Sequence, residues 1–149
     1  MSIIFNQALV PGALAPSTDT YEALLLTEHT GADGADADDD TVTALLAHAN
    51  VVEAAHTNYA RVTLTGVAAS VNDVDDRGEL TSDNITFPAL AYGDGSPAAV
   101  TAVVICRVDG AGDGNRVPLY LDDTNFPVAP DGNNYRVTVT RLLDFVQAP

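Results

Sequence analysis

The chain of 149 residues contains no lysine, no tryptophan and a single cysteine, Cys106. All six basic residues are arginines, against 17 aspartates and four glutamates, so the formal net charge is −15. Repulsion among so many like charges opposes a compact state in dilute buffer. Molar salt shortens the screening length to about 3 Å and removes most of this penalty. The many short, hydrated aspartates and the absence of lysine, with its long apolar stem, therefore predict a protein that works in near-saturated salt. Such a protein would come from a haloarchaeon or one of its viruses.

These absences also exclude several classes of function. Six scattered arginines form no basic stripe, so we expect no nucleic-acid partner. One cysteine permits neither an intrachain disulfide nor a cysteine-based metal site, and Cys106 is predicted to be a small core residue. No apolar run approaches about 18 residues, so no membrane-spanning helix is expected. The N-terminal segment MSIIFNQALVPG has no positive region, and we do not interpret it as a secretory signal.

The segment Ala99–Val108 is predicted to be a strand that is apolar on both faces. Alternate residues are apolar on both faces, which is typical of a strand covered on both sides. The segment Asp109–Asn115 supplies turn residues, and Arg116–Asp122 resumes with apolar residues on one face. This predicts a central hairpin. Thr20–His29 is predicted to be a second strand buried on both faces.

The segment Thr41–His56 is the one predicted helix. Its apolar residues recur at spacings of three and four and form one stripe: Val42, Leu45, Leu46, Ala49 and Val52. The aspartate-rich loop Gly31–Asp40 precedes it, and Asp39 or Asp40 is expected to accept hydrogen bonds from the first free backbone N–H groups.

The remainder of the chain indicates short strands and turns. Tyr59–Val67 alternates in polarity, Ile85 and Phe87 share one face of a further strand, and Tyr135–Val146 has the pattern of a long last strand. Asn72–Asn84 is interpreted as a polar excursion.

Six or seven strands, one early helix and no βαβ alternation predict an all-β protein. We expect a single β-sandwich or jelly-roll-like domain over residues 19–149, with one inserted α-helix at about 41–56. Residues 1–18 are predicted to be an N-terminal arm that either adds an edge strand or lies along a neighbouring subunit.

Three acidic clusters are candidate cation sites. The strongest candidate consists of Asp73, Asp75 and Glu79, because aspartates at positions one and three and glycine at position six resemble the start of a calcium loop. Arg77 and Asn84 stand at positions five and twelve, where that loop requires oxygen ligands and a bidentate acid. The other clusters are Asp33, Asp36 and Asp38, and Asp109, Asp113 and Asn115. We predict no cofactor beyond calcium at the first cluster or loosely bound sodium, potassium or magnesium ions.

No catalytic constellation is evident, so we do not expect an enzyme. The available bases are His29, His48 and His56, the GxSxG motif is absent, and the serines fall in loops or termini. No carboxylate pair stands out as that of a glycosidase. His48 and His56 match no zinc spacing and are interpreted as surface residues.

A series of short segments resembles the small β-sandwich virion proteins of tailed viruses, of the head-fibre, head-decoration and tail-fibre type. The segments are ALLLT, NYARVTLTG, ITFPAL, VTAVVIC, LYLDD and FPVAPDGNNYRVTVTRLL, between Thr20 and Val146. The resemblance implies an oligomeric structural component with no catalytic residues to carry over. The aspartate-rich loops and the missing lysine and tryptophan depart from the pattern in the direction that salt adaptation predicts.

Combined with the composition, the resemblance predicts a non-enzymatic structural protein of a tailed virus of a haloarchaeon. We expect a capsid accessory protein, such as a decoration, turret or head-fibre subunit, that assembles in the host cytoplasm and resides in the virion. Its partners would be copies of itself and other virion proteins, with no membrane contact. Two alternatives remain: a tail or baseplate subunit that contacts the host receptor, and a halophilic calcium- or carbohydrate-binding β-sandwich module.

Two further expectations concern subunit contacts. The apolar strands Tyr21–Thr27 and Leu142–Val146 exceed the needs of one small sandwich, so part of this surplus is predicted to be buried between subunits together with Met1–Leu14. Several arginines are expected to form intersubunit pairs with carboxylates. The candidates are Arg61, Arg107, Arg116, Arg136 and Arg141.

Overall fold

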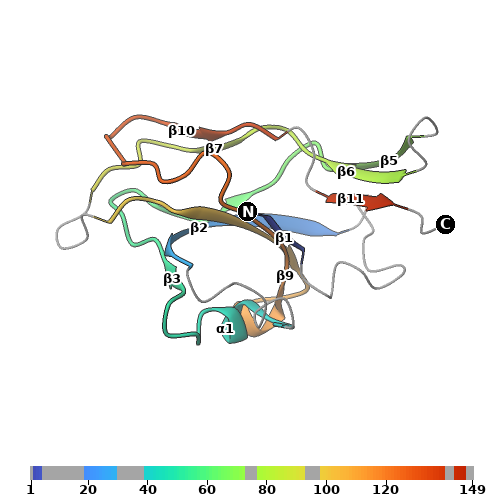
Figure 1. Ribbon diagram of the computed structural model, residues 1–149, viewed down its shortest axis with the longest axis horizontal. Helices are drawn as coiled ribbons and strands as arrows, with labels where there is room; N and C mark the ends of the chain where they lie inside the picture. The colour runs from blue at the N-terminus through green and yellow to red at the C-terminus, as the bar shows by residue number, and fades with distance from the viewer. Residues whose placement is uncertain are drawn as a thin grey trace.

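A six-stranded antiparallel sheet forms the middle layer of the molecule (Figure 1). The computed structural model describes residues 2–4, 19–29, 39–72, 77–92, 98–139 and 143–146. The strand order is β1-β9-β8-β2-β3, and β4 also pairs with β2. The bounds are β1 Ser2–Ile4, β2 Thr20–Glu28, β3 Val52–Glu53, β4 Val62–Thr63, β8 Ala102–Val108 and β9 Arg116–Asp122.

Two smaller sheets cover one face of this layer, and the helix α1 (Val42–Leu45) lies against the other (Figure 1). One small sheet pairs β10 (Tyr135–Val137) with β7 (Ile85–Phe87). The other has the order β11-β6-β5, with β11 Leu143–Val146, β6 Arg77–Thr81 and β5 Ala68–Asn72. All of these pairings are antiparallel. The predicted all-β, sandwich-like class with one small helix is confirmed.

The central strand β8 is buried on both faces, as its composition predicts. It pairs with β2 from Val108 opposite Thr20 to Ala102 opposite Leu26, and with β9 across the predicted hairpin turn. Its side chains alternate between two separate cores. The sandwich core consists of Tyr21, Ala23, Leu25, Ala54, Leu64, Leu80, Ile85, Phe87, Leu90, Val100, Val103, Ile105 and Leu119. The helix-side core consists of Leu24, Leu26, Val42, Leu45, Val51, Ala102, Val104, Cys106 and Leu121.

The apolar surplus of β2 is buried inside the chain itself. Each apolar residue from Tyr21 to Leu26 is at most 1% exposed, since one face lies in the sandwich core and the other in the helix-side core. The expectation that part of Tyr21–Thr27 is covered by a second subunit is therefore wrong. The main sheet is covered on both faces, and it therefore needs apolar residues on both faces within a single chain.

The prediction of a helix over 41–56 is wrong in its extent. The helix α1 spans only Val42–Leu45, and the chain turns at 46–50 before Val52–Glu53 join β2 as β3. Val42 and Leu45 reach the helix-side core within one turn, whereas Ala54 lies in the sandwich core. The predicted stripe does not continue as one buried helix face, because Ala49 and Val52 are exposed.

The N-cap also differs from expectation. Thr41 has extended backbone geometry, and its hydroxyl accepts a hydrogen bond from the Ala44 N–H at 3.2 Å. Asp39 instead bonds His48, with 3.0 Å between the carboxylate and Nε2. A threonine immediately before the first turn is a preferred cap, and its short side chain leaves the aspartate available to the imidazole.

Two predicted strands are interrupted. In 59–67 only Val62–Thr63 form β4, because Gly66 adopts φ +62° and turns the chain toward β5. An added Cβ at Gly66 would lie 2.6 Å from the Asp83 carboxyl group, so this position requires glycine. The last segment runs antiparallel to 77–87 but divides into β10 and β11, and its register slips by one residue between them.

The interpretation of Asn72–Asn84 as a polar excursion is wrong for β6, which pairs with both β5 and β11. Its Leu80 enters the sandwich core, while its sequence lacks the apolar alternation by which a strand is recognised. Backbone pairing with two neighbours holds this segment in place.

Ser2–Ile4 form the strand β1 beside β9, which is the edge-strand arrangement that the sequence left open. The rest of the predicted arm, residues 5–18, lies outside the described residues, as do Met1 and most of the aspartate-rich loop. Among the described residues, no helix combines the length and apolar character needed to cross a bilayer.

The helix-side core generates a stability prediction. Leu45→Ala removes a fully buried side chain from α1, the only α-helix in the described part of the chain. We expect a loss of about 2–5 kcal/mol of unfolding free energy, measured by urea denaturation in 3 M KCl. Thr43→Ala, at an exposed position of the same turn, should change stability by less than about 0.5 kcal/mol. Equal effects of the two substitutions would contradict this role of α1.

Candidate functional site

The predicted calcium-like cluster is described only in part. Asp73 and Asp75 lie outside the described residues. Glu79 is a partly buried residue of β6, opposite Ser70 of β5 and Asp144 of β11. Within the described residues, no group of three or more histidine, cysteine, aspartate or glutamate side chains is placed to hold a metal ion. The metal assignment of Asp73, Asp75 and Glu79 stays a prediction.

The other two acidic clusters have different outcomes. Asp33, Asp36 and Asp38 lie outside the described residues. In the third cluster Asp109 bonds Arg107, Asp113 bonds Arg61, and Asn115 donates to the Ala111 carbonyl. The third cluster is therefore a set of partners for arginine and backbone groups.

Arginine and carboxylate side chains form a network at one end of the main sheet. The Arg61 Nε lies 2.7 Å from the Glu53 Oε1, and the same guanidinium also binds Asp113. The Arg116 Nε lies 2.7 Å from the Glu22 Oε2, and its Nη1 lies 3.8 Å from Asp113. Because Asp113 contacts both guanidinium groups, the network joins β2, β3 and β9 to the residue before β4 and to the hairpin turn.

The expectation of intersubunit pairing is wrong for three of the arginines. Arg61, Arg107 and Arg116 all pair with carboxylates of their own chain. Residues distant in sequence, such as Arg116 and Glu22, meet because β8 lies between β9 and β2, which sequence spacing does not reveal. Arg136 is exposed, and Arg141 lies outside the described residues.

The network shifts the titration of its members. Hydrogen bonding to Glu53 raises the pKa of Arg61, and hydrogen bonding to Arg61 lowers the pKa of the Asp113 carboxyl group. Burial and the hydrogen bond to Glu53 raise the pKa of Tyr59. The Tyr59 hydroxyl donates to the Glu53 Oε1 at 2.7 Å and accepts from the Leu25 N–H at 3.1 Å. These groups are held in the charge states that maintain their mutual bonds, which favours a structural role for the network.

Cys106 lies in the helix-side core, as predicted. Its thiol is fully buried, donates to the Glu22 carbonyl at 3.3 Å, and has its pKa raised to about 12 by burial. A protonated, inaccessible thiol is a poor nucleophile and a poor metal ligand, so this residue contributes packing.

The interpretation of His56 as a surface residue is wrong. His56 is 5% exposed, and its Nε2 lies 2.8 Å from the Ala98 carbonyl oxygen. Its ring packs against Tyr92 with centroids 5.9 Å apart. The residue links the segment after β3 to the chain entering β8, a long-range contact that the local polar pattern could not indicate. His48 remains partly exposed beside Asp39, with a side-chain exposure of 37%.

One row of groups has the order of a catalytic triad. The His29 Nδ1 lies 2.9 Å from the Thr101 Oγ1, and its Nε2 lies 3.4 Å from the Asp123 Oδ2. The Thr101 hydroxyl also donates to the Leu26 carbonyl at 3.3 Å, which directs its proton away from the imidazole. Activation of a nucleophile requires that proton to pass to the base. We therefore infer that these three residues have a structural role and connect the ends of β2 and β9.

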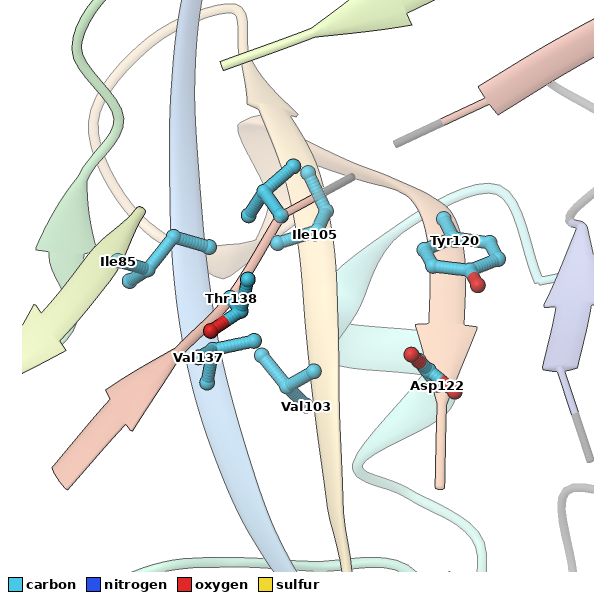
Figure 2. A pocket seen from close by; sticks show the side chains of 8 residues that line it. Ile85, Val103, Ile105, Tyr120, Asp122, Val137 and Thr138 are labelled. Carbon is cyan, nitrogen blue, oxygen red and sulfur yellow. The ribbon is translucent and has the colours of Figure 1, made fainter. Parts of the chain in front are cut away.

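A cleft opens where the two layers of the sandwich separate beside β9 and β10. Its inner part is a cavity of about 30 Å³, room for a water molecule. Figure 2 shows the inner part, with Val103 and Ile105 of β8 on one side, Ile85 and Val137 on another, and Tyr120 and Asp122 of β9 facing them. Asp122 is the carboxylate of this wall, and it also accepts a hydrogen bond from the Thr124 N–H at 2.8 Å.

The outer part of the cleft is a pocket of about 270 Å³. Both parts share Asp122, Val137 and Thr138. The remaining residues of the pocket wall are Thr124, Asn125, Phe126, Val128, Tyr135 and Arg136. Sequence reasoning missed this pocket entirely. Its one signal in the sequence is an aromatic, proline-containing connection between two strands, NFPVAPDGNN.

The chain was compared with family models, curated proteins and solved structures, and nothing matched in any of the three comparisons.

The arginine network generates a second stability prediction. Arg61→Gln leaves Glu53 and Asp113 without their shared cation, and we expect a loss of about 1–3 kcal/mol of unfolding free energy. The matched control is Arg107→Gln, because the carboxylate of its Asp109 partner is 45% exposed and such pairs contribute little. Urea denaturation of both variants at pH 7 compares them. A loss no larger for Arg61→Gln than for Arg107→Gln would contradict the role of the network.

Proposed function

We propose that this protein is a non-enzymatic structural protein of a tailed virus particle that assembles in the cytoplasm of a halophilic host. Within the particle it acts as a head-surface accessory subunit of the decoration, turret or head-fibre kind. It contacts further copies of itself and other virion proteins.

The observation that carries this proposal is where the resembling segments meet. The segments NYARVTLTG, ITFPAL and VTAVVIC contribute Leu64, Phe87 and Val103, among others, to the one sandwich core. Segments dispersed over more than 40 residues thus form a single packed unit around β8, which is what a shared scaffold requires. A sheet with a core on each face also suits a protein whose role is to hold contacts.

The charge distribution supports the high-salt setting. Arg61, Arg107 and Arg116 are each engaged by carboxylates of the same chain, while the formal net charge is −15. Most acidic groups therefore have no arginine available to them, and solvent cations must compensate them. Near-saturated salt supplies such cations and screens the remaining repulsion.

The edge of the main sheet supports self-association. Among the described strands β1 pairs only with β9, so its other edge carries backbone groups that could pair with another strand. Such edges readily accept a strand from another chain, and closed symmetric rings are the usual form of homo-oligomers.

The salt dependence of stability tests the proposed environment. We expect the melting temperature to rise between 0.1 and 3 M KCl, by about 2–4 °C for each kcal/mol of repulsion that is screened. Sucrose at the osmolality of the 3 M KCl sample is the control, because it stabilises without screening charge. A protein equally stable at both salt concentrations, or stabilised as strongly by sucrose, would argue against salt adaptation.

The composition and imaging of purified virions test the role itself. Peptides of this chain should appear in mass spectra of particles purified from a haloarchaeal host, and sandwich-shaped density should lie on the head surface. Density on the tail or baseplate would replace the head assignment by the receptor-contacting alternative. Absence of the chain from purified particles would refute the proposal.

A further inference from the structure

The outer pocket of the cleft has the composition of a ligand site. It holds about 270 Å³, close to the lower end of the roughly 300–1,000 Å³ range of small-molecule pockets. Its wall combines two aromatic rings, a carboxylate, a guanidinium, an amide and three hydroxyl groups. A ligand of this size would be a single ring with several polar substituents.

The aromatic part of the wall is fixed by packing. Phe126 meets Tyr135 nearly edge to face, with centroids 6.0 Å apart and planes at 65°. Tyr135 stacks in turn on Phe87 of the sandwich core, with centroids 6.5 Å apart. Because the rings continue into the core, they offer a surface that needs little ordering when a ligand binds.

The polar part of the wall is electrically balanced. Asp122 carries one negative charge and Arg136 one positive charge. Burial and the charge of Asp122 raise the pKa of Tyr135 to about 12, so its hydroxyl stays a hydrogen-bond donor at neutral pH. Asn125, with φ +69°, stands between Thr124 and Phe126 and adds an amide to the same wall.

Arg136 is distinguished from the other described arginines. Arg61, Arg107 and Arg116 bind carboxylates of their own chain, whereas Arg136 is exposed on the pocket wall and forms no such pair within the described residues. Within the part of the chain that the structure describes, no carboxylate takes up its donors, which leaves them for another molecule.

We propose that this pocket binds one hexose ring of a neutral carbohydrate. The apolar C–H face of the sugar would lie on Phe126 and Tyr135, and its hydroxyl groups would bond Asp122, Asn125 and Arg136. Carboxylate, amide and guanidinium groups can each bond two neighbouring hydroxyls. The balanced charge disfavours an anionic ligand, and one carboxylate is too few for a divalent cation.

The proposal does not rest on the virion role, because the pocket exists in the isolated chain. Hydrogen bonds and stacking also persist in molar salt, where attraction between exposed charges is largely screened.

Titration followed by NMR tests the site. The ¹⁵N-labelled full chain in 2 M KCl is titrated with D-glucose, D-galactose, D-mannose and N-acetyl-D-glucosamine, each up to 50 mM. Glucuronate is the anionic comparison, and glycerol is the control for unspecific polyol effects. We expect at least one neutral hexose to produce saturable amide shifts centred on Thr124, Asn125, Arg136 and Thr138.

Two arginine variants distinguish the pocket from the rest of the surface. Arg136→Gln should weaken binding at least tenfold, whereas Arg107→Gln, which removes the same charge outside the pocket, should leave it unchanged. Because Arg136 is exposed and makes no ion pair in the described part of the chain, its loss should not unfold the protein, and the amide spectrum itself verifies this. Absence of saturation with every neutral hexose, unchanged affinity in Arg136→Gln, or tighter binding of glucuronate would each overturn the proposal.

Discussion

The constraint on which the structure depends is the apolar character of β8 and β2 on both faces. A strand pair of this kind cannot lie at the surface, because burial of its side chains is the main source of its stability. One layer must cover each face. The small sheets supply the first and the segment around α1 supplies the second. The other described elements complete these two layers.

Arginine side chains contribute further contacts between the strands of the main sheet. The ion-pair network lies where β2 and β9 begin and the hairpin turn ends, and its arginines add polar contacts between strands that also share the two cores. Three of the six arginines pair with carboxylates of their own chain, and the formal net charge of −15 is left for solvent cations to compensate. Under high salt this division has little cost, since screening removes the long-range repulsion among the surface carboxylates.

The cleft lies beside the layer of small sheets, which is divided in two. Since β7–β10 and β5–β6–β11 form separate sheets, this layer does not close completely over β9. Asp122 and the residues following β9 fill the margin of the opening with polar groups, and Phe126 and Tyr135 connect it to the core. A stable scaffold and a pocket of hexose size are thus compatible in this chain. The proposed structural role and the proposed carbohydrate site use different parts of it.

The sequence by itself determined the β class, the central hairpin and the two-sided burial of β8 and Cys106, because these depend on local alternation of apolar residues. It could not determine the extent of α1, since the apolar stripe that begins at Val42 and Leu45 keeps helical spacing as far as Val52, which is exposed. Only the tertiary structure decided the burial of His56, the arginine pairing, the β6 strand and the pocket around Asp122 and Arg136. Each of these arises where residues distant along the chain meet across strands, and such meetings follow from sheet order, for which local sequence carries no signal.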